Sequence, residues 1–218
     1  MADYATASRE ARQRVTALVR GLDDDLLARS APATPEWRVR DVLAHLAGVT
    51  ADIVSGNLDG APSDGWTARQ VEQRQDSPLE ELLAEWNEHG AAVDAMARES
   101  PDPAWTTLLS DVATHEHDLR GALDARGARD SDALAISFEL WVTHGLAVPL
   151  TVETDAGTFS SHHDVSVATV RAERFELFRA MTGRRSVDQM AAYHWSGAAH
   201  PEALVAPRFT PRATPLIE

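Results

Sequence analysis

The sequence lacks two residue types on which much protein chemistry depends. It has no cysteine, and all 20 of its basic residues are arginine, so it has no lysine. Without cysteine there is no protein thiolate, disulfide, iron–sulfur cluster or Cys-type zinc site. Without lysine there is no Schiff base, pyridoxal phosphate anchor or phosphate-loop lysine. A nucleophile must therefore come from a hydroxyl, a carboxylate, a histidine, metal-bound water or a small-molecule cofactor.

Long apolar runs and an excess of basic charge are also missing. No run reaches the roughly 18 apolar residues of a membrane span, and the N-terminus lacks the basic and apolar regions of a signal peptide. The 34 acidic residues outnumber the 20 basic ones, giving a net charge of −14. Surfaces that bind nucleic acid or anionic membranes carry a basic excess, so neither is expected as a partner. We expect a cytoplasmic monomer or homodimer that acts on small molecules.

The hydropathy pattern predicts a mainly α protein in two parts. Apolar residues spaced three and four apart predict helices over residues 5–29, 39–57, 78–99, 105–126 and 131–144. Valine-, leucine- and threonine-rich segments at 146–154, 158–161 and 165–170 predict strands, followed by helices at 173–182 and 186–195. Ser77 and Ser186 each begin a capping-box pattern. We expect a helical bundle over 1–145, a small α+β domain over 146–200 and an extended tail over 201–218.

Three side chains on two of these helices could meet inside the bundle. His45 lies at the edge of the apolar stripe of its helix, and Asp111 and His115, four residues apart, border the stripe of theirs. If the two helices pack together, the three side chains converge. Three nitrogen and oxygen ligands with an open fourth position are typical of a catalytic zinc or a similar divalent ion. On spacing alone, a core histidine and a surface ion pair remain alternatives.

Other residues of the helix predicted over 105–126 have different expected roles. Asp118 lies on the same flank as His115 and could orient a ligand histidine from behind. His117 is predicted to point away from the stripe into solvent. Glu116 falls at the far apolar edge, where the pattern offers no explanation for a carboxylate.

Three motifs in order resemble one known family. Residues 37–47 (WRVRDVLAHLA), 111–120 (DVATHEHDLR) and 176–186 (ELFRAMTGRRS) resemble motifs of the mycothiol-dependent maleylpyruvate isomerase family. The resemblance implies a DinB-like four-helix bundle with a small C-terminal α+β domain. It also implies metal ligands at His45, Asp111 and His115. The family commonly has glutamate where this sequence has the shorter Asp111, so its helix must approach the metal more closely or a water must bridge.

The resemblance implies a chemistry as well. A divalent metal, typically zinc, binds the thiol of mycothiol or a related thiol, which then attacks an electrophilic carbon in an isomerisation or thiol transfer. A thiol supplied by a cofactor is consistent with a chain that has no cysteine. Arginine clamps carboxylates through two hydrogen bonds, and Arg120 is a candidate to capture thiol or substrate because it follows the second motif.

Other polar residues have structural explanations, and two other functions remain open. His162 and His163 are predicted to face solvent, His144 to interact with a helix C-terminus, and Arg184 and Arg185 to form an exposed helix cap rather than an anion site. Trp37 is expected to pack where its helix begins. A non-catalytic metal or ligand sensor on the same bundle remains the alternative to an enzyme, and a bundle that has lost its metal and serves assembly is a third possibility.

Overall fold

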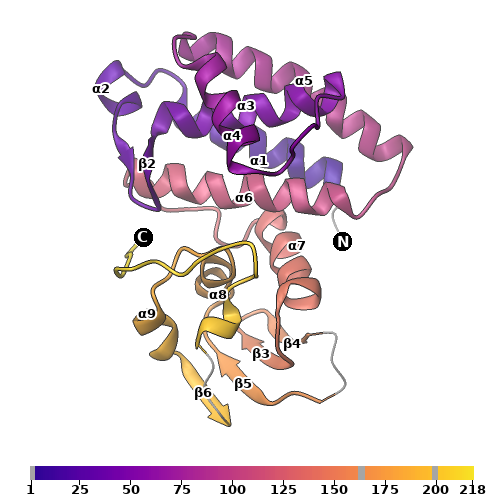
Figure 1. Cartoon of the computed structure of the whole chain (residues 1–218), viewed down its shortest axis with the longest axis vertical. Helices are drawn as coiled ribbons and strands as arrows, with labels where there is room; N and C mark the ends of the chain where they lie inside the picture. Colours follow the sequence, from indigo (N-terminus) through magenta and orange to yellow (C-terminus); the bar gives the residue numbers. More distant parts are fainter. Residues whose placement is uncertain (1–2, 162–164, 198–200) are drawn as a thin grey trace. The chain divides into compact units, whose positions relative to one another are not determined.

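The computed structural model describes residues 3–161, 165–197 and 201–218, and the predicted histidine pair at 162–163 lies outside them. The chain divides into two compact units, Met1–Gly127 and Ala128–Glu218 (Figure 1). Asp124 and Ala128 adopt positive φ angles of 54° and 56° at this division. The division lies earlier than the expected boundary at residue 145, so the helix predicted over 131–144 belongs to the second unit.

Four long helices build the first unit. They are α1 (Tyr4–Val19), α3 (Val39–Ser55), α5 (Leu79–Glu99) and α6 (Ala104–Ala122). Helices α1 and α3 each contact both α5 and α6, which closes a four-helix bundle (Figure 1). Its core contains large, fully buried side chains, each contributing about 1.5–3 kcal/mol by its burial: Leu43, Leu46, Leu82, Trp86, Leu109 and Leu119. The predicted helical bundle is confirmed.

Several shorter elements of this unit differ from the prediction. The first helix ends at Val19, near Gly21 with φ +76°, and α2 (Asp24–Leu27) follows as a separate turn. A small hairpin, β1 (Ser30–Ala31) and β2 (Thr34–Arg38), leads into α3, and α4 (Asp64–Arg74) follows it. Helix α4 was not predicted because its sequence is mostly polar and has no apolar stripe. Helix α5 begins after Pro78 without a side-chain cap, so the capping box expected at Ser77 does not form.

An arginine–carboxylate pair caps the N-terminus of α3. The Asp41 carboxylate accepts hydrogen bonds from the backbone N–H of Arg38 and from its guanidinium, each at 2.8 Å. Burial acts to raise the pKa of Asp41, but the hydrogen bonds and charge of Arg38 outweigh it and lower that pKa. The pair fixes the turn from β2 into the helix that carries His45.

The second unit is a small α+β fold, as predicted. Its sheet has the order β4 (Gly157–Ser160), β3 (Leu150–Thr154), β5 (Ala168–Arg171), β6 (His194–Gly197), with β3 and β5 parallel and the other neighbours antiparallel. The unit also contains α7 (Asp132–Leu140), a π-helical turn (Trp141–Gly145), α8 (Arg174–Met181), α9 (Val187–Ala191) and a 3₁₀ turn (Pro201–Leu204). The capping box predicted at Ser186 forms with Gln189.

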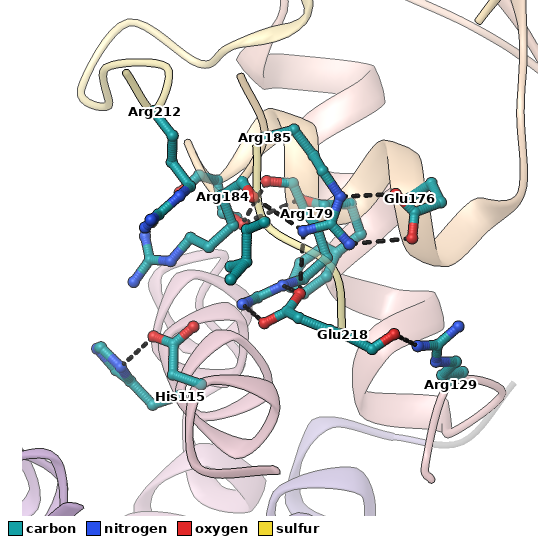
Figure 2. Close-up of polar contacts among 12 residues, drawn as sticks. His115, Arg129, Glu176, Arg179, Arg184, Arg185, Arg212 and Glu218 are labelled. Carbon is teal, nitrogen blue, oxygen red and sulfur yellow. Dashed lines mark hydrogen bonds and ion pairs between the residues drawn. The ribbon is translucent and has the colours of Figure 1, made fainter. Parts of the chain in front are cut away.

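A buried ionic cluster fixes the final segment of the second unit (Figure 2). Arg179 binds the Glu218 carboxylate through two nitrogens, and Arg185 binds both Glu218 and Glu176. The side chains of Arg179 and Arg185 are 0% and 1% exposed. The expectation of an exposed cap at Arg184 and Arg185 is therefore wrong, since both residues are buried. The segment 201–218 is packed rather than free, because Leu204, Ala206 and Leu216 are buried too.

Among the described residues, no helix has the length and apolar character that crossing a membrane requires.

Candidate metal centre

The structure brings the three predicted ligands together within the first unit. His45 on α3 and Asp111 and His115 on α6 each offer one ligand atom, and these atoms all lie within 4.8 Å of one another. His45 Nε2 lies 3.2 Å from one Asp111 carboxylate oxygen, and His115 Nε2 lies 3.6 Å from the other. Both histidine side chains are buried, whereas the Asp111 side chain is 34% exposed. The cluster therefore lies inside the bundle with one side open to solvent.

Hydrogen bonds behind His45 determine which ring nitrogen faces the cluster. Its Nδ1 lies 2.9 Å from Gln70 Oε1, and the Gln70 amide nitrogen donates to Asp52 at 2.8 Å. With the amide oxygen on that side, Nδ1 carries the proton and donates it. The lone pair of Nε2 then points toward Asp111, as a metal ligand requires.

His115 is oriented in the same sense by a different group. Its Nδ1 lies 3.0 Å from an oxygen of Asp118, whose side chain is fully buried. A carboxylate behind a ligand histidine fixes the tautomer and makes the ring a stronger ligand. This contact is the one expected for Asp118 from the sequence.

The donor set fits a divalent cation. When both rings are neutral with Nδ1 protonated, their Nε2 lone pairs face a carboxylate that only accepts hydrogen bonds, so acceptor faces acceptor. Such a set is stabilised by a cation, either a shared metal or protons that convert the rings to imidazolium. Two histidines, one carboxylate and an open side are typical of a catalytic zinc site. Metal binding by these residues stays a prediction.

Trp37 forms an aromatic wall beside the two ligand rings. Its ring centroid lies 5.1 Å from that of His45 and 5.6 Å from that of His115, nearly parallel to the latter. The expected position at the start of α3 is correct, and the contact with both ligands adds to it. The half-buried indole shields the rings from water on this side.

Arginine contacts explain Glu116 and change the expectation for its neighbours. Glu116 is 1% exposed and accepts paired hydrogen bonds from Arg14 on α1 and from Arg120. Arg120 is thus held by Glu116 and by the backbone oxygen of Ala125 at 3.2 Å, and no contact between it and the ligand cluster is observed among the described residues. His117, expected in solvent, is 3% exposed because α6 is enclosed on that face as well.

Two residues behind His45 were not identified from the sequence. Gln70 lies on α4, the helix that the hydropathy pattern did not predict. Asp52 lies seven residues after His45, so both occupy one face of α3. That spacing was the sequence signal for Asp52. Because α4 was not predicted, no side chain was expected to bridge Asp52 and His45.

Comparisons with known proteins identify the family. The family model of the mycothiol maleylpyruvate isomerase N-terminal domain matches residues 8–126. A crystal structure of a histidine-to-alanine mutant of the mycothiol-dependent maleylpyruvate isomerase is similar with a TM-score of 0.60 at 14% identity, covering 91% of this chain and 94% of the other. A second crystal structure of the mycothiol-dependent maleylpyruvate isomerase has a TM-score of 0.57 at the same identity and coverage. No curated protein sequence matches. Since the family model spans more than half of the sequence, the chain belongs to the family of the mycothiol maleylpyruvate isomerase N-terminal domain.

Proposed function

We propose that the protein is a divalent-metal-dependent enzyme that uses a low-molecular-weight thiol, mycothiol or a related compound. The reaction is an isomerisation or a thiol transfer on an electrophilic small molecule. Family membership supports the use of mycothiol, and the structures it resembles are of a mycothiol-dependent maleylpyruvate isomerase. The observation that carries the proposal is the convergence of His45, Asp111 and His115 with both Nε2 atoms turned inward.

Each residue of the site has a clear role in this chemistry. His45, Asp111 and His115 would hold the ion, for which zinc fits the nitrogen and oxygen donors. When bound, the ion supplies a Lewis acid that lowers the pKa of a coordinated thiol. Two neutral rings and one carboxylate leave the loaded site with a net charge of about +1, which favours an anionic sulfur. The open side at Asp111 admits the thiol, and Trp37 excludes water from the ligand rings.

The metal content of the protein tests the first half of the proposal. Protein purified without a histidine tag should contain one equivalent of zinc or another divalent ion. His115→Ala should bind far less, whereas His194→Ala, which removes an exposed histidine of β6, should bind as the parent does. Full metal content in alanine variants of all three ligands would place the metal elsewhere.

Thiol binding tests the second half. Cobalt-substituted protein titrated with mycothiol or another small thiol should develop a saturable sulfur-to-cobalt charge-transfer band in the near ultraviolet. If cobalt is bound but no thiol gives this band, the thiol mechanism is wrong and the protein is better described as a metal or ligand sensor.

Arg120 remains a proposed contact for the thiol or the substrate. Its side chain is 15% exposed and its guanidinium is bound to Glu116, so capture of an anion would require it to share or leave that carboxylate. The Arg120→Gln variant should weaken the thiol titration without changing metal content. An unchanged titration would remove Arg120 from the site.

A further inference from the structure

Gln70 connects the candidate metal centre to a chain of hydrogen bonds that ends at the surface. Its side chain is buried, with the residue 1% exposed, and it bridges His45 Nδ1 and the Asp52 carboxylate. The other Asp52 oxygen accepts a hydrogen bond from the Asn57 amide at 2.9 Å. Asn57 is exposed. The chain thus runs from solvent through a carboxylate and an amide to a ligand ring.

The direction of every hydrogen bond in this chain follows from the Asp52 carboxylate. A carboxylate only accepts, so the Gln70 NH₂ group must face Asp52. The Gln70 oxygen must then face His45, and that oxygen also only accepts. Nδ1 of His45 must therefore carry a proton, and in the neutral ring this leaves Nε2 deprotonated, 3.2 Å from Asp111 Oδ2. An amide alone would permit either orientation, and Asp52 removes this ambiguity.

Helix α4 is packed so that Gln70 can reach this position. A Cβ atom at Gly48 of α3 would lie 2.5 Å from Gln70 Cβ, so the close approach of the two helices depends on this glycine. Arg74, one turn further along α4, is bound to Glu85 of α5 through two nitrogens at 2.7 and 2.8 Å. The same arginine donates to the Gln70 backbone oxygen at 3.2 Å. Helix α4 is thus held at Gln70 by its close packing on α3, and one turn later by Arg74.

We infer that Gln70, directed by Asp52, is a positioning residue that holds His45 in the tautomer with Nε2 free to bind a metal. The consequence for metal binding rests on the proposed function. The consequence for the tautomer does not, because it concerns hydrogen bonds within the metal-free protein.

The tautomer of His45 tests the inference without metal. Long-range ¹H–¹⁵N NMR of the full chain at alkaline pH, where an imidazole is neutral, distinguishes protonated Nδ1 from protonated Nε2. The parent should show His45 protonated at Nδ1. In Gln70→Leu the ring should shift toward protonation at Nε2, because Asp111 Oδ2 lies 3.2 Å from Nε2 and remains to accept that proton. The matched control is Gln73→Leu, an exposed glutamine of the same helix, which should resemble the parent.

Zinc affinity, measured by competition with a chelator, tests the consequence. Gln70→Leu should bind zinc about 10–100-fold more weakly than the parent, the usual cost of losing a partner behind a ligand histidine. Gln73→Leu should bind as the parent does.

A double variant separates hydrogen-bond direction from damage to the fold. In Asp52→Asn/Gln70→Glu the asparagine NH₂ can donate to the new carboxylate, which can accept from His45 Nδ1, while the asparagine oxygen still accepts from Asn57. This variant should keep Nδ1 protonated and bind zinc at least as tightly as the parent. Binding as weak as that of Gln70→Leu, or a Gln70→Leu protein with the parent's tautomer, would overturn the inference. A parent protein that binds no zinc would contradict the proposed function instead and leave the NMR test intact.

Discussion

Each unit of the molecule buries a cluster of ionisable side chains, and the two clusters differ in how their charges are matched. In the second unit, guanidinium groups face carboxylates: Arg179 and Arg185 bind Glu218, and Arg185 also binds Glu176 (Figure 2). In the first unit, two imidazole nitrogens face the oxygens of Asp111. In the first arrangement donors face acceptors, whereas in the second, when the rings are neutral, nitrogen lone pairs face carboxylate oxygens that a bound cation would bridge.

This difference distinguishes a structural cluster from the proposed metal site. Buried ion pairs contribute little net stability, but removing one partner is expensive because the other charge stays buried. A ligand cluster behaves differently, because an ion that binds only the folded chain adds its binding free energy to the stability of the fold. Mutations and metal removal should therefore affect the two units differently.

The largest expected effect is the loss of Glu218. Glu218→Gln leaves Arg179 buried without its counter-charge and should reduce the stability of the second unit by about 3–5 kcal/mol. Hydrogen–deuterium exchange with urea should show faster exchange in α8, whereas the bundle helices stay protected. Glu202→Gln, at an exposed position of the same segment, is the control and should change little. Unchanged protection of α8 in the Glu218 variant would show that its carboxylate is dispensable.

Removal of metal should instead destabilise the helical bundle and leave the second unit unchanged. With zinc at about 100 times its Kd, the bundle should gain about 2.7 kcal/mol of stability, and a chelator should abolish the gain. The second unit should not respond. His115→Ala should remove the zinc-dependent gain in Tm, whereas His194→Ala should retain it. A gain that persists without His115 would indicate a different ligand set.

A smaller effect is expected where α3 and α4 meet. Gly48→Ala places a methyl group against Gln70 and should cost about 1–3 kcal/mol through overpacking, measured by urea unfolding. It should also weaken zinc binding, because it displaces the partner of His45. Gly65→Ala is the matched control on α4, where a Cβ atom meets only a hydroxyl 4.0 Å away. Equal stability of the two variants would mean that α3 and α4 can move apart to fit the methyl group without a measurable loss of stability.

The sequence predicted those parts of the site that depend on local periodicity. The four-residue spacing of Asp111 and His115 fixed their common face on α6, and the apolar stripe placed His45 beside them. Contacts that depend on tertiary packing were not predictable in this way. Glu116 could not be explained without Arg14, which lies 102 residues away in sequence.

The elements that were missed share a physical cause. Helix α4 is stabilised by Arg74, Trp66 and Gln70 through contacts with other elements, not by an apolar stripe of its own. Likewise, Arg184 and Arg185 looked exposed because charged residues rarely bury without partners. The burial of Arg185 depends on the carboxylates of Glu176 and Glu218, whereas Arg184 donates to the Thr182 carbonyl two residues away.

The smallest effect should come from Arg38 and Asp41, which pair the same chemical groups as the second-unit cluster but with only the carboxylate buried. The Arg38 side chain is 49% exposed, so the ion pair itself contributes only about 0–1 kcal/mol. Asp41→Asn should therefore reduce stability by about 1 kcal/mol at neutral pH, chiefly through the weakened cap of α3. Because folding lowers the pKa of Asp41, its contribution is present above the unfolded value of about 3.9 and is lost as the pH falls through the folded pKa. The difference between parent and variant in urea unfolding should thus shrink below about pH 4, whereas the larger loss in Glu218→Gln should be evident at neutral pH. A difference for Asp41→Asn as large as that for Glu218→Gln would show that burial is not what distinguishes the two ion pairs.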